Sequence, residues 1–107
     1  MIGVGFGKME MGGLNLALKA SGQKFGLQLL AVLMASRSGR GFNDLLREIP
    51  DISPRTLSLR LKELEAKRLI SKNISMGPRL RIEYRITENG LLFEKAIAEM
   101  AVAGLKL

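Results

Sequence analysis

Cysteine and histidine are both absent from the 107-residue sequence, and their absence removes most catalytic and metal-binding chemistries. Without cysteine there is no disulfide, no thiolate nucleophile and no Cys-rich zinc site, which fits a reducing compartment. Without histidine the commonest general base and transition-metal ligand are missing. Glu63 and Glu65 lie two positions apart on a predicted helix, so they point in different directions and form no carboxylate pair. We expect no enzyme, no metal and no cofactor.

Long hydrophobic runs and aromatic residues are also scarce. The longest uncharged apolar stretch lies between Lys24 and Arg37, and it is shorter than the roughly 20 residues that span a bilayer. The N-terminus has no basic region followed by an apolar run and a cleavage site, so we expect no signal peptide, no membrane partner and a cytoplasmic protein. Aromatic residues make up 5% of the chain, and the paired aromatics that stack RNA bases are missing.

What the sequence does contain is an excess of positive charge. Seventeen Lys and Arg against ten Asp and Glu give a net charge of +7, which favours an anionic partner such as nucleic acid. The length suits one domain with a single core. Residues 1–13 are rich in glycine and lack periodicity, so we expect a flexible arm there and the folded domain over residues 14–107.

Three helices are predicted in the first half of the chain. Residues 14–20 suggest a short helix, and residues 23–35 a helix that is apolar on nearly all sides and therefore central. After the break at residues 36–41, residues 42–49 carry apolar side chains on one face. Asn43 or the residue before it is the expected N-cap of this third helix.

The strongest local signal begins at Ser53. Its hydroxyl suits an N-cap, and Pro54 suits the first helical position, where a missing N–H has no consequence. Leu57, Leu61 and Leu64 then recur at i, i+4 and i+7, which predicts one buried stripe on a helix over about residues 53–68.

A hairpin and a final helix complete the pattern. Residues 69–74 and 81–86 are predicted strands, the second because charged and apolar residues alternate strictly, and residues 76–79 form the turn. A last helix is expected over residues 88–104, capped by Thr87. Two helices joined by a tight turn and followed by a hairpin predict an α+β fold, the winged helix-turn-helix.

The charge is concentrated in the predicted reading helix and wing. Between residues 53 and 85 there are nine Lys and Arg against three Glu, a net six of the chain's seven positive charges. We expect the first turn, with Arg55 and Thr56, to reach base edges in a major groove, and the wing, about residues 73–81, to lie on the backbone. Arg60 lies farther along the helix and suits a phosphate. The predicted DNA-binding residues are Ser53, Arg55, Thr56, Leu59, Arg60, Lys62, Arg79 and Arg81.

Several residues in this region have a structural alternative. Leu59 is either buried or turned toward DNA, and Lys67 and Arg68 either contact phosphate or complement the helix dipole. We interpret Glu83 and Arg85 as a solvated strand face. Tyr84 is interpreted as a core or interface residue.

The sequence resembles the HxlR-type family of winged-helix transcription regulators. The resemblance covers about residues 14–105 and rests on Gly22-Gln23-Lys24-Phe25, Phe42-Asn43-Asp44-Leu45, the run from Ile52 to Glu65, Arg81-Ile82-Glu83-Tyr84 and Ile86-Thr87-Glu88-Asn89-Gly90. It implies a homodimer, with the terminal helices packed across the twofold axis, bound to a palindromic operator in double-stranded DNA.

This chain departs from the family pattern in three places. Many members carry a sensing cysteine near the first helix, and this chain has none, so thiol sensing is excluded. The usual tryptophan is Phe25, which keeps a large apolar anchor. The wing over residues 73–80 differs from the Pro-rich family loop. Any effector would act by other means, such as a small molecule at the dimer interface, and the sequence identifies none.

The alternative function is a winged helix used as a protein-interaction or chromatin-type module with only non-specific DNA affinity. Fold alone does not separate the two functions. A duplex-specific interaction favours a regulator, whereas equal binding to any polyanion favours the alternative.

Overall fold

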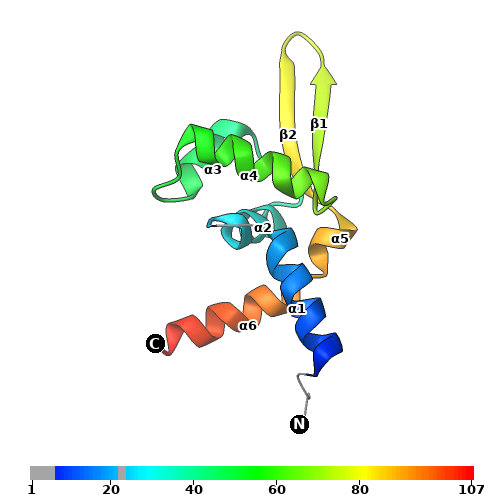
Figure 1. The fold of residues 1–107 in the computed structure, drawn as a ribbon. Helices are drawn as coiled ribbons and strands as arrows, with labels where there is room; N and C mark the ends of the chain where they lie inside the picture. The colour runs from blue at the N-terminus through cyan, green and yellow to red at the C-terminus, as the bar shows by residue number, and fades with distance from the viewer. Residues whose placement is uncertain (1–6, 22–23) are drawn as a thin grey trace.

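The computed structural model describes residues 7–21 and 24–107 as a helical body with one antiparallel hairpin. The elements follow in the order α1 (Lys8–Ser21), α2 (Gly26–Ala35), α3 (Phe42–Glu48), α4 (Pro54–Ala66), β1 (Ile70–Met76), β2 (Leu80–Ile86), α5 (Glu88–Leu91) and α6 (Glu94–Leu105). The hairpin projects from one end of the molecule, and α6 with the C-terminus lies toward the other (Figure 1). The fold is the winged helix-turn-helix expected from the sequence.

Leucine side chains from three helices fill the core between these elements. The central helix α2 is apolar on most sides because the other helices and the hairpin surround it. On α4, the stripe predicted from the i, i+4, i+7 spacing is fully buried. The side chains with the least exposure are Leu29, Leu30, Leu33, Leu45, Leu57, Leu61, Leu64 and Ile70.

A tight turn connects α3 to α4 and fixes the angle between them. Ile49 and Ile52 are buried on either side of it, at 3% and 8% exposure. Between them, Asp51 has a φ of 67°, in the left-handed region that Asp tolerates better than most residues. The buried isoleucines hold the turn against the core, so the start of α4 is set by packing on both sides.

The end of α4 turns the chain directly into the hairpin. Arg68 adopts a φ of 62°, and its N–H donates to the carbonyl of Glu65 at 2.9 Å. The N–H of Leu69 donates to the carbonyl of Leu64 at 3.0 Å, which completes a Schellman motif. This local structure accounts for the position of Arg68, and its charge remains exposed.

The hairpin is anchored to the body of the domain at its base. Antiparallel pairing runs from Ile70–Ile86 at the base to Met76–Leu80 at the tip. Tyr84 also exchanges two backbone hydrogen bonds with Arg40, at 2.8 and 2.9 Å, which forms an isolated antiparallel bridge beside β2. Tyr84 is a core residue, and its burial, together with the smaller effect of the Glu65 charge, raises the pKa of its phenol.

The structure corrects several expected boundaries. The first helix begins at Lys8 rather than at residue 14, so residues 8–13 of the expected arm are helical; residues 1–6 lie outside the described part. The N-cap of α3 is Gly41 rather than Asn43 or Phe42, and the Asp44 carboxylate accepts the Gly41 N–H at 3.3 Å. The second strand begins at Leu80, one residue earlier than predicted.

The expected helix over residues 88–104 is interrupted. Leu92 and Phe93 donate to the carbonyls of Asn89 and Gly90 at 3.2 and 3.1 Å, three residues back, instead of continuing the helical pattern. The chain then restarts as α6. Phe93 and Ile97 pack against the core, so tertiary packing determines the change of direction.

Candidate nucleic-acid interface

The interface predicted from the sequence begins at the capped end of α4. The N–H of Thr56 donates to Ser53 Oγ at 3.1 Å, and Ser53 Oγ donates to Thr56 Oγ1 at 3.0 Å. Pro54 occupies the first turn, as the sequence predicts. The Ser53 hydroxyl is therefore engaged in fixing the helix start, so Ser53 positions the first turn from which the exposed Arg55 projects.

One stripe of α4 is turned directly away from the core. Arg55, Leu59 and Lys62 recur at i, i+4 and i+7 on the side opposite the buried leucines, and all three are exposed. Leu59 is 50% exposed, which resolves its alternative placement in favour of the surface. Neither cation of the stripe forms an ion pair with any residue in the described part of the chain. We call these three residues the α4 stripe.

Arg60 lies on the flank of α4 and is held by the protein itself. Its side chain is 14% exposed; Nε donates to the Lys24 carbonyl at 2.9 Å, and Nη1 lies 2.9 Å from Glu63 Oε1. Arg60 is predicted from the sequence to lie on the outward face as a phosphate contact, but the helical rotation carries it to the side, beside Thr56. These contacts make Arg60 a tether between α4 and the segment before α2.

The contact between Arg60 and Lys24 places beside α4 a cation that is not among the predicted DNA-binding residues. Lys24 is exposed, and its ammonium lies 5.1 Å from the Phe25 ring centroid, over the ring. Phe25 has a φ of 79° immediately before α2, a backbone conformation that residues other than glycine rarely adopt. Lys24 belongs to the Gly22-Gln23-Lys24-Phe25 motif, which could have drawn attention to it. The sequence alone does not show that Lys24 lies beside α4.

The wing adds further cations. Lys72, Arg79 and Arg81 are exposed and have no ion-pair partner among the described residues, whereas Arg85 lies 3.7 Å from Glu83. Arg81 pairs with Ser75 across the hairpin, and Arg79 lies in the turn. The solvated pair of Glu83 and Arg85 agrees with the sequence interpretation.

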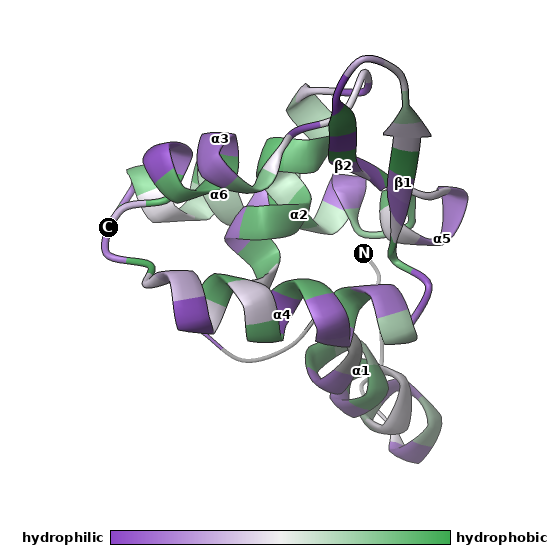
Figure 2. Ribbon diagram, turned by 90° about the horizontal axis from the view of Figure 1, so that it is seen from above, coloured by the Kyte–Doolittle hydropathy of each residue, from purple (hydrophilic) through white to green (hydrophobic). Residues whose placement is uncertain are grey.

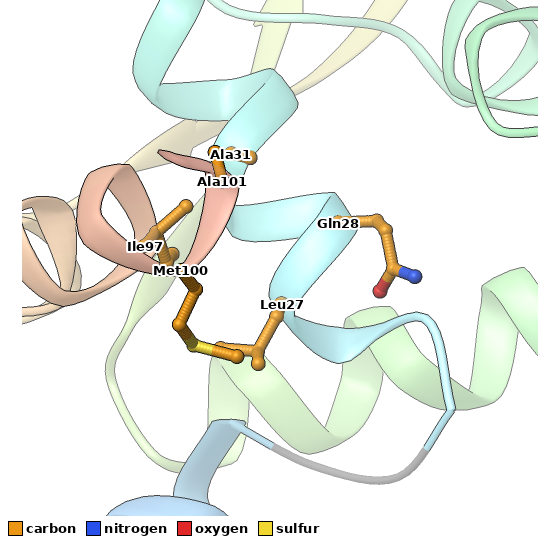
Figure 3. Close-up of a pocket in the computed structure, with 6 residues that line it drawn as sticks. All are labelled: Leu27, Gln28, Ala31, Ile97, Met100 and Ala101. Atoms are coloured by element: carbon orange, nitrogen blue, oxygen red, sulfur yellow. The ribbon is translucent and has the colours of Figure 1, made fainter. Parts of the chain in front are cut away.

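A second surface, on the terminal helices, is apolar. On α1, Met9 and Leu16 are 84% and 70% exposed, and α6 has no buried residue. Between α2 and α6 lies an open groove of about 340 Å³, in which Gln28 is the one polar side chain (Figure 3). The lining residues are Leu27, Gln28, Ala31, Ile97, Met100 and Ala101.

Two further kinds of site were sought among the described residues, a metal site and a membrane span. Within residues 7–21 and 24–107, no group of three or more acidic side chains lies close enough to hold a metal ion. No helix in these ranges is sufficiently long and apolar to cross a bilayer.

Comparison with known proteins places this geometry in a family. The HxlR-like helix-turn-helix family matches residues 21–106. Two Bacillus subtilis (strain 168) proteins, both uncharacterised HTH-type transcriptional regulators, are similar in sequence. YvaP is 29% identical over 72 residues, 67% of each chain, and YybR is 34% identical over 59 residues, 55% of this chain and 47% of YybR.

Solved structures agree with the sequence relationship. The redox regulator HypR in its reduced form is 27% identical, with a TM-score of 0.79 over 87% of this chain and 90% of HypR. Its oxidised form is 26% identical, with a TM-score of 0.81 over 88% and 95%. The family match spans most of the sequence, and the hairpin and helix-turn-helix are those of the solved relatives. The chain therefore belongs to the HxlR-like helix-turn-helix family.

Proposed function

We propose that the protein is a cytoplasmic transcriptional regulator that binds specific duplex DNA sequences as a homodimer. The observation that supports this most directly is the distribution of arginine partners. Among the described residues, five of the nine arginines form an ion pair, with a carboxylate oxygen within 4 Å. The four unpaired ones all lie on α4, at its end or on the wing: Arg55, Arg68, Arg79 and Arg81.

In this proposal α4 enters the major groove. Arg55, in the first turn, has a free guanidinium that suits guanine O6 and N7. Leu59 suits the methyl group of a thymine farther along the groove, and Thr56 has a hydroxyl proton left to donate. Lys62 and the cations of the wing hairpin, Lys72, Arg79 and Arg81, contact phosphates on either side, and Arg60 holds α4 in place rather than contacting DNA.

Footprinting of genomic fragments, with Arg55→Ala as the variant, tests the reading surface. Wild-type protein should protect two half-sites about one helical turn apart. Loss of one bidentate pair to guanine costs about 1–3 kcal/mol, so Arg55→Ala should weaken each half-site about 10- to 100-fold and relax the preference at one base pair. Arg37→Ala, which removes an exposed ion pair with Glu94, is the matched control and should bind like wild type.

Two outcomes would contradict this reading surface. Unchanged affinity and specificity in Arg55→Ala would remove α4 from the interface. Equal binding to duplex DNA and to a generic polyanion would favour the alternative, a protein-interaction or chromatin-type module.

The apolar surface of the terminal helices supports the dimer. Met100, Val102 and Leu105 on α6 are 57%, 50% and 88% exposed, and α1 presents Met9 and Leu16 in the same way. So many exposed large apolar side chains on two helices are unusual for a monomer. A second copy that covers them, with side chains seated in the groove between α2 and α6, would bury both helices and place two α4 helices for one palindromic site.

Sedimentation of Leu16→Glu tests the dimer. A charge in an apolar interface should raise the dimer dissociation constant by at least about 100-fold, because the carboxylate loses its hydration on burial. Lys19→Glu introduces the same charge on the same helix at an exposed charged position and should remain dimeric. A wild-type monomer at micromolar concentration, or two equally dimeric variants, would contradict this part of the proposal.

A further inference from the structure

One face of the hairpin is apolar except for Lys72, although only its base is covered. The residues that share this face pair across the hairpin as Ile70–Ile86, Lys72–Tyr84, Ile74–Ile82 and Met76–Leu80. At the base, Ile70 and Tyr84 are buried in the core, at 2% and 9% exposure. Beyond them, the outer four apolar side chains project past the domain; Ile74, Met76, Leu80 and Ile82 are 58%, 85%, 64% and 37% exposed.

The opposite face of the hairpin is polar. Its pairs are Ser71–Arg85, Asn73–Glu83 and Ser75–Arg81, as the alternation of side chains along a strand requires. Figure 2 shows hydrophobic and hydrophilic segments alternating along the hairpin. A ribbon that extends only into water is expected to be polar on both faces in its outer half, so the exposed apolar half indicates a contact surface.

The charges around the apolar tip identify the partner as a polyanion. No carboxylate occurs between Glu65 and Glu83, a span that includes the whole outer hairpin. Arg79 and Arg81 are exposed and unpaired within the described residues, and they flank Leu80 in sequence. A narrow apolar tip bordered by free guanidinium groups is complementary to the DNA minor groove, which has deoxyribose walls and phosphates along its rims.

We propose that the tip of the wing is a minor-groove wedge. Met76 and Leu80 enter the groove beside the half-site read by α4 and partly unstack one base step, while Arg79 and Arg81 neutralise the phosphates on its two sides. Met, Leu and Pro are side chains that proteins use in this way, and Pro78 stiffens the turn. The inference rests on the proposed function.

The wedge would give the protein sequence preference at a position that it does not read by hydrogen bonds. Pyrimidine–purine steps such as TA unstack and kink easily, whereas A-tracts are stiff. Wild-type protein should therefore bind a half-site flanked by a TA step about tenfold more tightly than the same half-site flanked by an A-tract. The bound duplex should also be bent at that step.

The test compares wild type with the double variant Met76→Ser and Leu80→Ser. Because both side chains are largely exposed, the variant should unfold at the same temperature as wild type. Fluorescence of 2-aminopurine placed at the flanking step should rise when wild type binds and stay low with the variant. The variant should also lose the preference for TA while it still protects the half-site. The double variant Asn73→Ala and Ser75→Ala, on the polar face at neighbouring positions, is the control and should behave as wild type.

The outcomes separate this inference from the function on which it rests. If the serine variant retains the fluorescence rise and the TA preference, or if wild type shows neither while it protects the half-site, the wedge is overturned and the regulator is not. If wild type protects no duplex at all, both are overturned. If the serine variant loses binding to a protein partner but binds DNA as wild type does, the wedge is also overturned.

Discussion

Raising the NaCl concentration from about 50 to about 200 mM should weaken operator binding by about 10⁴-fold. Each phosphate that a Lys or Arg neutralises releases condensed counterions, and the slope of log affinity against log salt is about −0.9 per contact. Four exposed cations per protomer face phosphates in the proposed complex: Lys62, Lys72, Arg79 and Arg81. A dimer therefore makes about eight contacts, and the expected slope is about −7.

Substitutions locate the source of this salt dependence. Arg81→Ala removes one contact from each protomer, so the slope for the dimer should become shallower by about 2. Lys95→Ala, on α6 and far from the wing (Figure 1), removes the same charge and should leave the slope unchanged. Fluorescence anisotropy titrations at four or five salt concentrations measure both slopes. A wild-type slope near −2, or an equal effect of the two variants, would show that the wing and α4 do not contact the backbone.

The parts of the fold that the sequence predicts well are those determined by neighbouring residues. The Ser53 cap and Pro54 at the first helical position act within one turn, and α4 begins at Pro54. The leucine stripe follows from helical spacing, and all of its members are buried. The strict alternation from Arg81 to Ile86 likewise predicts the inner part of β2, which pairs as expected.

The errors arise where partners are distant in the chain. Arg60 is expected on the outward face of α4, but its Nε donates to the carbonyl of Lys24, 36 residues earlier, which keeps the side chain on the flank of the helix. The break between α5 and α6 cannot be predicted from local propensity, because Phe93 and Ile97 pack against a core that the other helices build. The apolar face of the wing is visible in the alternation, but its exposure depends on how far the hairpin extends past the domain.

The structure divides the predicted DNA-binding residues into those that are exposed and those that are engaged within the domain. Arg55, Leu59 and Lys62 share the exposed stripe, and Arg79 and Arg81 lie on the exposed wing. Ser53 caps α4 and Thr56 lies on its flank. Contact of any of these residues with DNA remains a prediction for the footprints and titrations to decide.

Replacing Gly90 with alanine should destabilise the domain by about 3 kcal/mol, because α5 approaches the preceding chain more closely than any side chain permits. A Cβ at this position would lie 2.2 Å from the carbonyl oxygen of Leu69 and 2.5 Å from Ile86 Cδ1. The oxygen cannot move freely, since it accepts the Thr87 N–H at 3.1 Å and belongs to the segment that enters β1. Thr87 also accepts the Gly90 N–H at 3.1 Å, which fixes the glycine from its own side.

The backbone conformation of Gly90 lies outside the left-handed region, so the expected loss is purely steric. Urea unfolding at one fixed protein concentration should show the loss, and the melting temperature should fall by more than about 10 °C. Gly104→Ala is the matched control: a Cβ there meets nothing within 4 Å, and alanine in a helix should stabilise α6 by about 0.5–1 kcal/mol. Two alanine variants of equal stability would mean that α5 does not lie against Leu69. The contact sets where α5 leaves the hairpin. A loss of stability in Gly90→Ala together with a gain in Gly104→Ala would support close packing of α5 against the base of the hairpin at Gly90.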